Sequence, residues 1–245
     1  MKDPAVKFSY RQRVTFLTGL VFLCLFTLLF IEPIPQDPAY HLFADTRTFL
    51  GVPNFNDVMS NSGFALFGFL GLTVLLGSKR ELIFRDSCDA RPYLLFFLGV
   101  ALVSLGSGYY HWEPSNERLL WDRLPMSIAF MAFTSAVIAD RVHANSGNSW
   151  LLAVLVILGV LSLFHWHHTE QLQRGDLRFY GFVQFFPIVL LPFLFWLFPR
   201  YQYVSGYYVA WVVGWYGLSK IMEFFDAGIF GLLGNLVSGH TLKHL

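Results

Sequence analysis

Long apolar runs separated by short polar segments dominate the chain from end to end. A helix needs roughly 20 apolar residues to cross the hydrocarbon core of a bilayer, so stretches approaching that length are candidate spans. They run approximately over Val14–Ile31, Val58–Leu76, Pro92–Tyr110, Leu119–Ala139, Trp150–Phe164, Phe179–Phe198, Val204–Met222 and from Leu232 onward. The last run breaks off at Leu245, too short to span, and we expect a truncated final helix. The pattern predicts an all-α, polytopic transmembrane helical bundle.

The composition supports a membrane environment. Hydrophobic residues make up 55% of the chain and charged residues only 13%, too few to cover the surface of a soluble fold of 245 residues. The formal net charge is +1, and the Lys and Arg residues are scattered, so no nucleic-acid-binding face is expected. Cys24 lies in an apolar run and Cys88 in a charged segment, so a disulfide between them is not expected.

The first apolar run follows a short basic segment, which is also how a signal peptide begins. Removal of this run is therefore an alternative. However, Ile31-Glu32-Pro33 lacks the small residues of a cleavage site, and the run exceeds the usual apolar region of about 7 to 15 residues. We expect the first helix to be retained.

The distribution of Lys and Arg predicts an orientation in the membrane. With a cytoplasmic amino terminus, the cytoplasmic segments hold Lys2, Lys7, Arg11, Arg13, Lys79, Arg80, Arg85, Arg91, Arg141 and Arg200. The opposite side holds only Arg47, Arg118, Arg123, Arg174 and Arg178. Because cytoplasmic loops carry the excess of basic residues, we expect an integral, multi-pass membrane protein with a cytoplasmic amino terminus.

Ionisable groups at membrane depth are costly, and their presence indicates a working site. His240 and His244 are four residues apart, a spacing that places both rings on one face of a helix, where they can share a metal ion. A hydrolytic zinc site takes three protein ligands and leaves one position open. His111 ends the third run on the predicted outer side of the membrane, where His240 and His244 also lie, and it is the natural third ligand. Asp122 begins a helix on the same side. Taken singly, each histidine is more typical of the membrane interface.

Three stretches resemble the alkaline ceramidases, particularly their bacterial relatives. They are Ser107 to His111, Trp121-Asp122-Arg123-Leu124-Pro125-Met126, and Ser238-Gly239-His240-Thr241-Leu242-Lys243-His244. Further agreement lies in Pro53 to Asn61, Gly175 to Tyr180 with Gln184, and Lys220 with Glu223 and Asp226. The resemblance extends from about Tyr40 to the end. The same arrangement marks a superfamily that includes the adiponectin and progestin receptors, so it identifies a zinc hydrolase scaffold better than a substrate.

The resemblance implies a seven-helix core over residues 41–245, preceded in residues 1–40 by a cytoplasmic tail and one extra transmembrane helix. It implies a catalytic zinc ion held by His111, His240 and His244. Asp122 is implied as the general base that activates water, and Ser107 as a group that stabilises the oxyanion. In animal members a glutamate of a calcium site falls on Asn54, so calcium binding is left open, with Asp45 and Asp57 nearby.

These expectations make the chain a zinc-dependent lipid amidase of a bacterial inner membrane. Its partners would be membrane lipids and a ceramide-like substrate, cleaved to a fatty acid and a sphingoid-type amine. The alternatives are a zinc-containing lipid receptor of the same scaffold with little or no hydrolysis, and a metal or proton transporter. Transport would require charged groups along a path through the whole bilayer, whereas here they gather toward one side. Which lipid amide is cleaved, and the oligomeric state, are not encoded in any recognisable motif.

Other polar clusters favour structural interpretations. The group from His165 to His168 ends an apolar run and is typical of the membrane interface. Lys220, Glu223 and Asp226 share one helix face and are expected to form a structural charge network, for which Arg123 and Arg178 are candidate partners inside the bundle. Ser60 and Asn61 are expected to form hydrogen bonds between helices.

Overall fold

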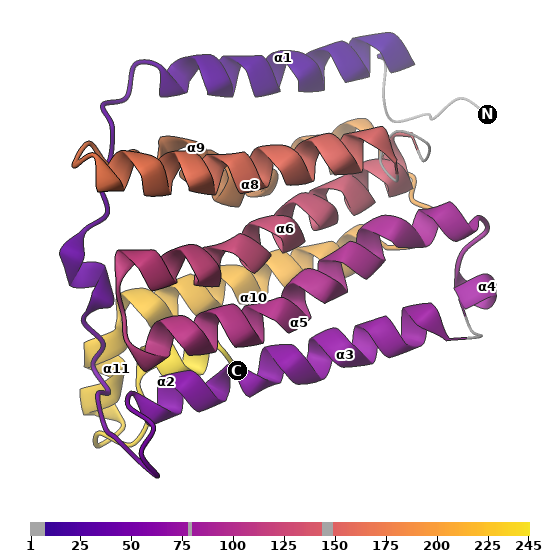
Figure 1. Cartoon of the computed structure of the whole chain (residues 1–245). Coiled ribbons are helices and arrows are strands. Elements are labelled where there is room, and N and C mark those ends of the chain that lie inside the picture. The colour runs from indigo at the N-terminus through magenta and orange to yellow at the C-terminus, as the bar shows by residue number, and fades with distance from the viewer. Residues whose placement is uncertain (1–7, 78–79, 144–148) are drawn as a thin grey trace.

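The computed structural model describes residues 8–77, 80–143 and 149–245, and the described residues form helices without a β-strand. The long helices lie lengthwise beside one another as a bundle (Figure 1). They are α1 (Tyr10–Leu28), α3 (Ser62–Leu76), α5 (Arg91–Trp112), α6 (Asn116–Arg141), α8 (Trp150–Gln171), α9 (Arg178–Leu197) and α10 (Gly206–Phe224). The shorter elements are η1 (Pro38–His41), α2 (Phe55–Ser60), α4 (Arg80–Ile83), η2 (Ser87–Ala90), α11 (Asp226–Leu232) and α12 (Gly239–Lys243). The expected all-α class is confirmed.

Within the described residues, six helical segments are long and apolar enough to cross a membrane. They are Tyr10–Leu28, Phe55–Leu76, Ser87–Trp112, Asn116–Arg141, Trp150–Gln171 and Arg178–Leu197. Helix α10 forms where the seventh run predicted a helix, but it is not one of these six. Of the basic residues used to predict orientation, Lys2, Lys7 and Lys79 lie outside the described residues.

The predicted eighth helix, from Leu232 onward, is wrong as a single element. Helix α11 already ends at Leu232, and the chain then passes through Gly234 (φ 64°) and Asn235 (φ 59°), both in the left-handed region. Such residues end a helix because this backbone conformation cannot continue it. A separate short helix, α12, follows at the end of the chain.

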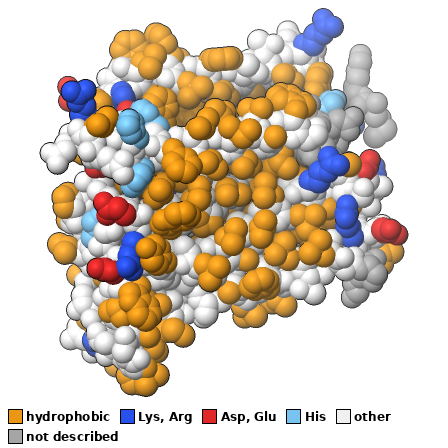
Figure 2. All heavy atoms as spheres, in the orientation of Figure 1, with side chains coloured by type: hydrophobic (Ala, Val, Ile, Leu, Met, Phe, Trp, Pro, Cys, Tyr) orange, Lys and Arg blue, Asp and Glu red, His pale blue; other side chains and the backbone are white. Residues whose placement is uncertain are grey.

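The surface of the bundle carries an apolar band between two polar ends. Hydrophobic side chains cover the middle of the face in Figure 2, while charged and histidine side chains gather toward the ends of the helices. Large apolar side chains on separate helices are more than half exposed, among them Phe67, Leu105, Leu161 and Trp215. Such a surface is stable against lipid and unfavourable in water. The protein is therefore a multi-pass membrane protein.

A close approach between α5 and α6 sets the inner frame of the bundle. A Cβ atom at Gly106 would lie 2.1 Å from the carbonyl oxygen of Trp121 and 3.4 Å from the Cα atom of Asp122. The helices can approach this closely only because Gly106 has no side chain. The contact lies one residue from Ser107, so it also fixes the distance between the two helices at the site described below.

We expect Gly106→Ala to destabilise the protein by about 1–3 kcal/mol, because the added methyl group must push the two backbones apart. Gly108→Ala is the matched control, since a Cβ atom there would meet nothing within 4 Å. Thermal unfolding in detergent micelles measures both. If the two variants unfold at the same temperature, the close approach does not limit packing.

Candidate metal centre

His111 lies in the last turn of α5 and is buried, with 1% of its surface exposed. Its backbone carbonyl accepts a hydrogen bond of 2.8 Å from Asn54 Nδ2, which ties the end of α5 to the segment before α2. The ring of Phe43 packs against the imidazole, with 4.7 Å between ring centroids. These contacts hold the side chain of His111 at the polar end of the bundle.

Helix α12 is only five residues long, so its neighbours must hold it in place. Ser238 caps it by accepting a hydrogen bond of 3.0 Å from the backbone N–H of Thr241. Asp226 Oδ1 accepts the backbone N–H of His240 at 2.7 Å. A Cβ atom at Gly239 would lie 2.2 Å from the carbonyl oxygen of Met222, so α12 packs directly on the backbone of α10. His240 and His244 thus turn toward α5.

The three predicted metal ligands come together. His111, His240 and His244 are all buried, and each offers one ligand atom within 4.8 Å of the others. Their ring centroids are 4.7 to 5.1 Å apart. They form the one group of three or more His, Cys, Asp or Glu side chains with this geometry in the described part of the chain. The group could hold a metal ion.

The distance between two of the three imidazoles matches that expected around a tetrahedral ion. His111 Nε2 and His240 Nε2 are 3.3 Å apart, and two nitrogens bound to one zinc ion at about 2.0–2.1 Å lie roughly 3.3–3.4 Å from each other. His111 Nδ1 is buried without a hydrogen-bond partner among the described atoms. Three imidazoles are a donor set that zinc accepts, and a fourth position is then free for water or substrate.

Ser60 supports the third ligand. Its Oγ atom is 2.9 Å from His244 Nδ1, which leaves Nε2 of that ring as the atom available to a metal. Hydrogen bonds of this kind fix the orientation of a ligating histidine. Asp57 holds the same region together, because Thr241 donates a hydrogen bond of 2.6 Å to its carboxylate. We predicted interhelical hydrogen bonding for Ser60, but its partner among the metal ligands was not foreseen.

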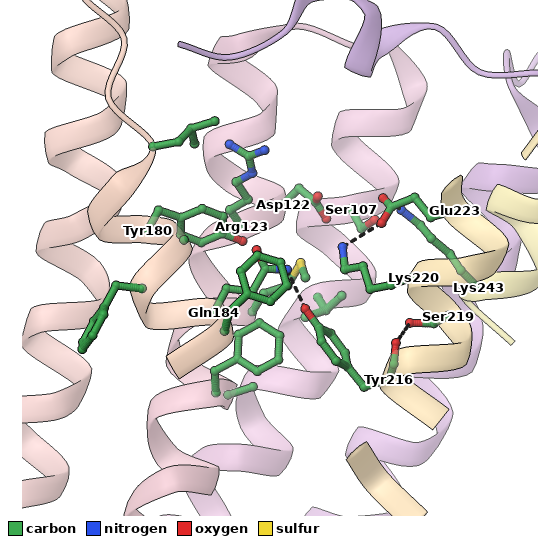
Figure 3. Close-up of a pocket in the computed structure, with 18 of the residues that line it drawn as sticks. Ser107, Asp122, Arg123, Tyr180, Gln184, Tyr216, Ser219, Lys220, Glu223 and Lys243 are labelled. Carbon is green, nitrogen blue, oxygen red and sulfur yellow. Dashed lines mark hydrogen bonds and ion pairs between the residues drawn. The ribbon is translucent and has the colours of Figure 1, made fainter. Parts of the chain in front are cut away.

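Asp122 and Ser107 line a cavity of about 1240 Å³ that His244 also lines. Both residues are buried, Asp122 in α6 and Ser107 one turn before His111 in α5. Figure 3 shows the two side chains next to each other at one end of the cavity. The five predicted site residues therefore belong to one region, with the histidine group on one side and the carboxylate and hydroxyl facing the cavity.

The charged groups on α10 pair differently from our prediction. Glu223 accepts Lys220 at 2.7 Å and Lys243 at 2.6 Å, so it binds two lysines rather than an arginine. Arg178 pairs instead with Asp176, and this guanidinium lowers the pKa of the Asp176 carboxyl to about 2. A structural charge network was therefore the right interpretation, but its suggested arginine partners were wrong, because helix periodicity shows which residues share a face and not what that face meets.

The residues considered for calcium are engaged elsewhere. The Asp45 carboxylate accepts a hydrogen bond of 2.7 Å from the Arg47 guanidinium and one of 2.8 Å from the Asn56 amide. Burial raises the pKa of Asp45, but these hydrogen bonds outweigh it and hold the pKa below its ordinary value. Asp57 accepts a hydrogen bond from the Thr241 hydroxyl, and the side-chain amide of Asn54 donates one to the backbone carbonyl of His111. Calcium prefers six to eight oxygen ligands around one point, and the described carboxylates do not gather in that way.

We expect purified wild-type protein to retain one metal ion per chain after dialysis, and His240→Ala to retain almost none. Loss of one of three ligands leaves too few donors for a stable site. His168→Ala, at an exposed position of α8, is the control. Elemental analysis by mass spectrometry gives the metal content. Equal metal content in His240→Ala and His168→Ala would show that His240 is not a metal ligand.

We also expect Ser60→Ala to weaken metal binding roughly 10- to 100-fold, because the ring of His244 loses the hydrogen bond that orients it. Ser62→Ala is the matched control, since Ser62 is exposed nearby at the start of α3. Competition with a chelator of known affinity measures the effect. An unchanged affinity in Ser60→Ala would show that this contact does not support the ligand.

No known protein-family model, curated protein or solved structure matches this chain. The assignment of a metal centre therefore depends on the geometry of the three histidines and on the groups that surround them.

Proposed function

We propose that this protein is a zinc-dependent intramembrane hydrolase that cleaves the amide bond of a ceramide-like lipid. The observation that carries the proposal is the meeting of three buried imidazoles beside a large cavity lined by a carboxylate and a hydroxyl. This combination supplies a metal site, a proton carrier and a place for a lipid in one region. The resemblance to alkaline ceramidases, based on the stretches around Ser107, Asp122 and His240, agrees with it.

His111, His240 and His244 would hold the zinc ion, with Ser60 orienting the last of them. When bound, zinc supplies a Lewis acid that lowers the pKa of a water molecule and polarises a carbonyl group. The role of the protein is then to place an amide carbonyl and a water molecule within reach of this site and to move protons between them.

Asp122 is suited to carry the proton. It faces the cavity and, as a carboxylate, can accept a proton from water as the water oxygen attacks the amide carbon. The same proton then passes to the amine nitrogen as the carbon–nitrogen bond breaks. Ser107 can donate a hydrogen bond to the oxygen that becomes negatively charged. One water molecule is consumed, and the products are a fatty acid and an amino-alcohol lipid.

The cavity suits a substrate with long apolar chains. Its volume of about 1240 Å³ exceeds the range of about 300–1,000 Å³ that is usual for small-molecule sites. Apolar side chains from α1, α3, α9 and α10 line much of it, including Leu28, Phe67, Phe185 and Trp215. A lipid held there could keep its acyl chain among apolar groups while its amide lies near Asp122.

We further propose the ceramidase-like arrangement, with α1 as an additional helix before a seven-helix core that ends in α12. The amino terminus would face the cytoplasm of a bacterium, with the metal centre toward the opposite side of the inner membrane. This orientation is supported by the excess of Lys and Arg at the cytoplasmic ends of the helices. Engineered cysteines, labelled from each side of intact cells, would test it.

We expect Asp122→Asn to lower kcat for fatty acid release from a labelled ceramide about 10²- to 10⁴-fold, because the amide cannot carry the proton. The variant should keep its metal, since Asp122 is not one of the three clustered ligands. His244→Ala should lose both metal and activity. Wild-type protein that binds zinc and lipid but releases no fatty acid would favour the receptor alternative, and Asp122→Asn with full activity would exclude the proposed proton carrier.

A further inference from the structure

Arg123 is a buried cation without a carboxylate partner. It follows Asp122 in α6, and 6% of its surface is exposed. Its Nη2 atom donates a hydrogen bond of 2.8 Å to Gln36 Oε1, while its Nη1 atom has no partner among the described atoms. Three rings surround the guanidinium, with the Cζ atom 4.6 Å from Trp166, 4.9 Å from Tyr180 and 5.3 Å from Tyr40.

Such an arrangement is unusual for an arginine at this depth. A buried charge normally pairs with an opposite charge, because removal from water is otherwise uncompensated. The described carboxylates form no ion pair with Arg123. Aromatic rings and one amide stabilise the guanidinium in part, but they do not neutralise it. One hydrogen-bond donor of Arg123 thus remains unpaired, and no carboxylate of the described residues binds the guanidinium directly.

Among the described residues, the carboxylates of the cavity form no direct ion pair with Arg123. Asp122, the neighbouring residue, lines the same cavity without forming one. Glu223 is shared by two lysines that also line the cavity, so this group carries a surplus positive charge of its own. Arg178 is neutralised by Asp176. Asp37 also lines the cavity and caps η1 by accepting a hydrogen bond from the backbone N–H of Ala39.

Tyr40 connects the two positive groups. Its ring lies under the Arg123 guanidinium, and its hydroxyl donates a hydrogen bond of 3.3 Å to Glu223 Oε1. Arg123 and the group formed by Glu223 with its lysines therefore flank the same end of the cavity, as Figure 3 shows. This is also the end at which Asp122 lies, where the proposed mechanism places the departing amine.

We propose that the lipid amide cleaved here carries an anionic group on its amine portion, and that Arg123 binds this group. The inference rests on the proposed hydrolase function and narrows its substrate class. A carboxylate or a phosphate has the required chemistry, since either accepts the paired N–H groups of a guanidinium. The anion would supply the absent counter-ion, and its position would place the adjacent amide bond beside Asp122.

The test compares three lipids with the same acyl chain: an N-acylglycine, an N-acylethanolamine phosphate and the neutral N-acylethanolamine. We expect wild-type protein to cleave at least one anionic lipid with kcat/KM about 10- to 100-fold above the neutral one, as for a charge-assisted hydrogen bond. Preference for the first or second anionic lipid identifies carboxylate or phosphate as the ligand. Equal or faster cleavage of the neutral lipid would overturn the proposal.

Arg123→Gln should bring this ratio close to one, while Arg123→Lys should retain part of it. A structural role for Arg123 would instead lower the rates for all three lipids in proportion. Arg118→Gln is the matched control on the same helix, because Arg118 pairs with Glu113 and does not line the cavity. It should leave the ratio at the wild-type value.

A binding measurement separates failure of this inference from failure of the hydrolase proposal. If no lipid is cleaved, the hydrolase proposal fails, and thermal shifts with the same lipids still report on Arg123. The anionic lipids should then raise the unfolding temperature of wild-type protein more than the neutral lipid does, and Arg123→Gln should remove the difference. Equal shifts in wild-type protein would reject Arg123 as an anion-binding residue.

Discussion

The docking of α12 against the rest of the bundle is the contact on which the site depends. A helix of five residues has no stability of its own, yet it contains His240 and is followed directly by His244, two of the three clustered histidines. Its residues donate three hydrogen bonds to carboxylates outside α12, namely those of Asp226, Glu223 and Asp57. These partners lie on other helices, so the histidine group comes together only when α12 is docked against α2, α10 and α11 beside α5.

Polar groups are concentrated where they can be paired, and this explains how an apolar bundle tolerates them. Glu223 joins two lysines, Asp226 accepts two backbone N–H groups, and Asp45 binds a guanidinium. Pairing of this kind offsets much of the cost of placing charges near hydrocarbon. Some buried polar atoms nevertheless have no hydrogen-bond partner among the described atoms, and those near the histidine group and the cavity include Asp57 Oδ2, His111 Nδ1 and Arg123 Nη1.

Much of the fold could be predicted from apolar runs, because helices in lipid must satisfy their own backbone and therefore follow hydropathy closely. The spacing of His240 and His244 likewise predicted a shared face. The break at Gly234 and Asn235 was missed, since the left-handed backbone there lies within an apolar stretch. Ser60 was missed as the partner of His244 because the contact joins residues 184 positions apart, which no local pattern reveals.

Helix α1 completes the wall of the cavity, although it packs mainly on α9. Arginine side chains bind backbone carbonyls at its two ends: Arg13 donates to Leu197 at 2.9 Å, and Arg178 donates to Leu28 at 3.1 Å. Between these points the helix contributes apolar contacts only around Leu17, while Leu28 faces the cavity. Helix α1 is thus held by two arginine contacts and a short apolar contact, whereas α5 and α6 pack so closely that Gly106 leaves no room for a side chain. The structure thus combines a closely packed helix pair beside the histidine group with a cavity wall that makes fewer contacts, an arrangement that would suit entry of the proposed lipid substrate from the bilayer.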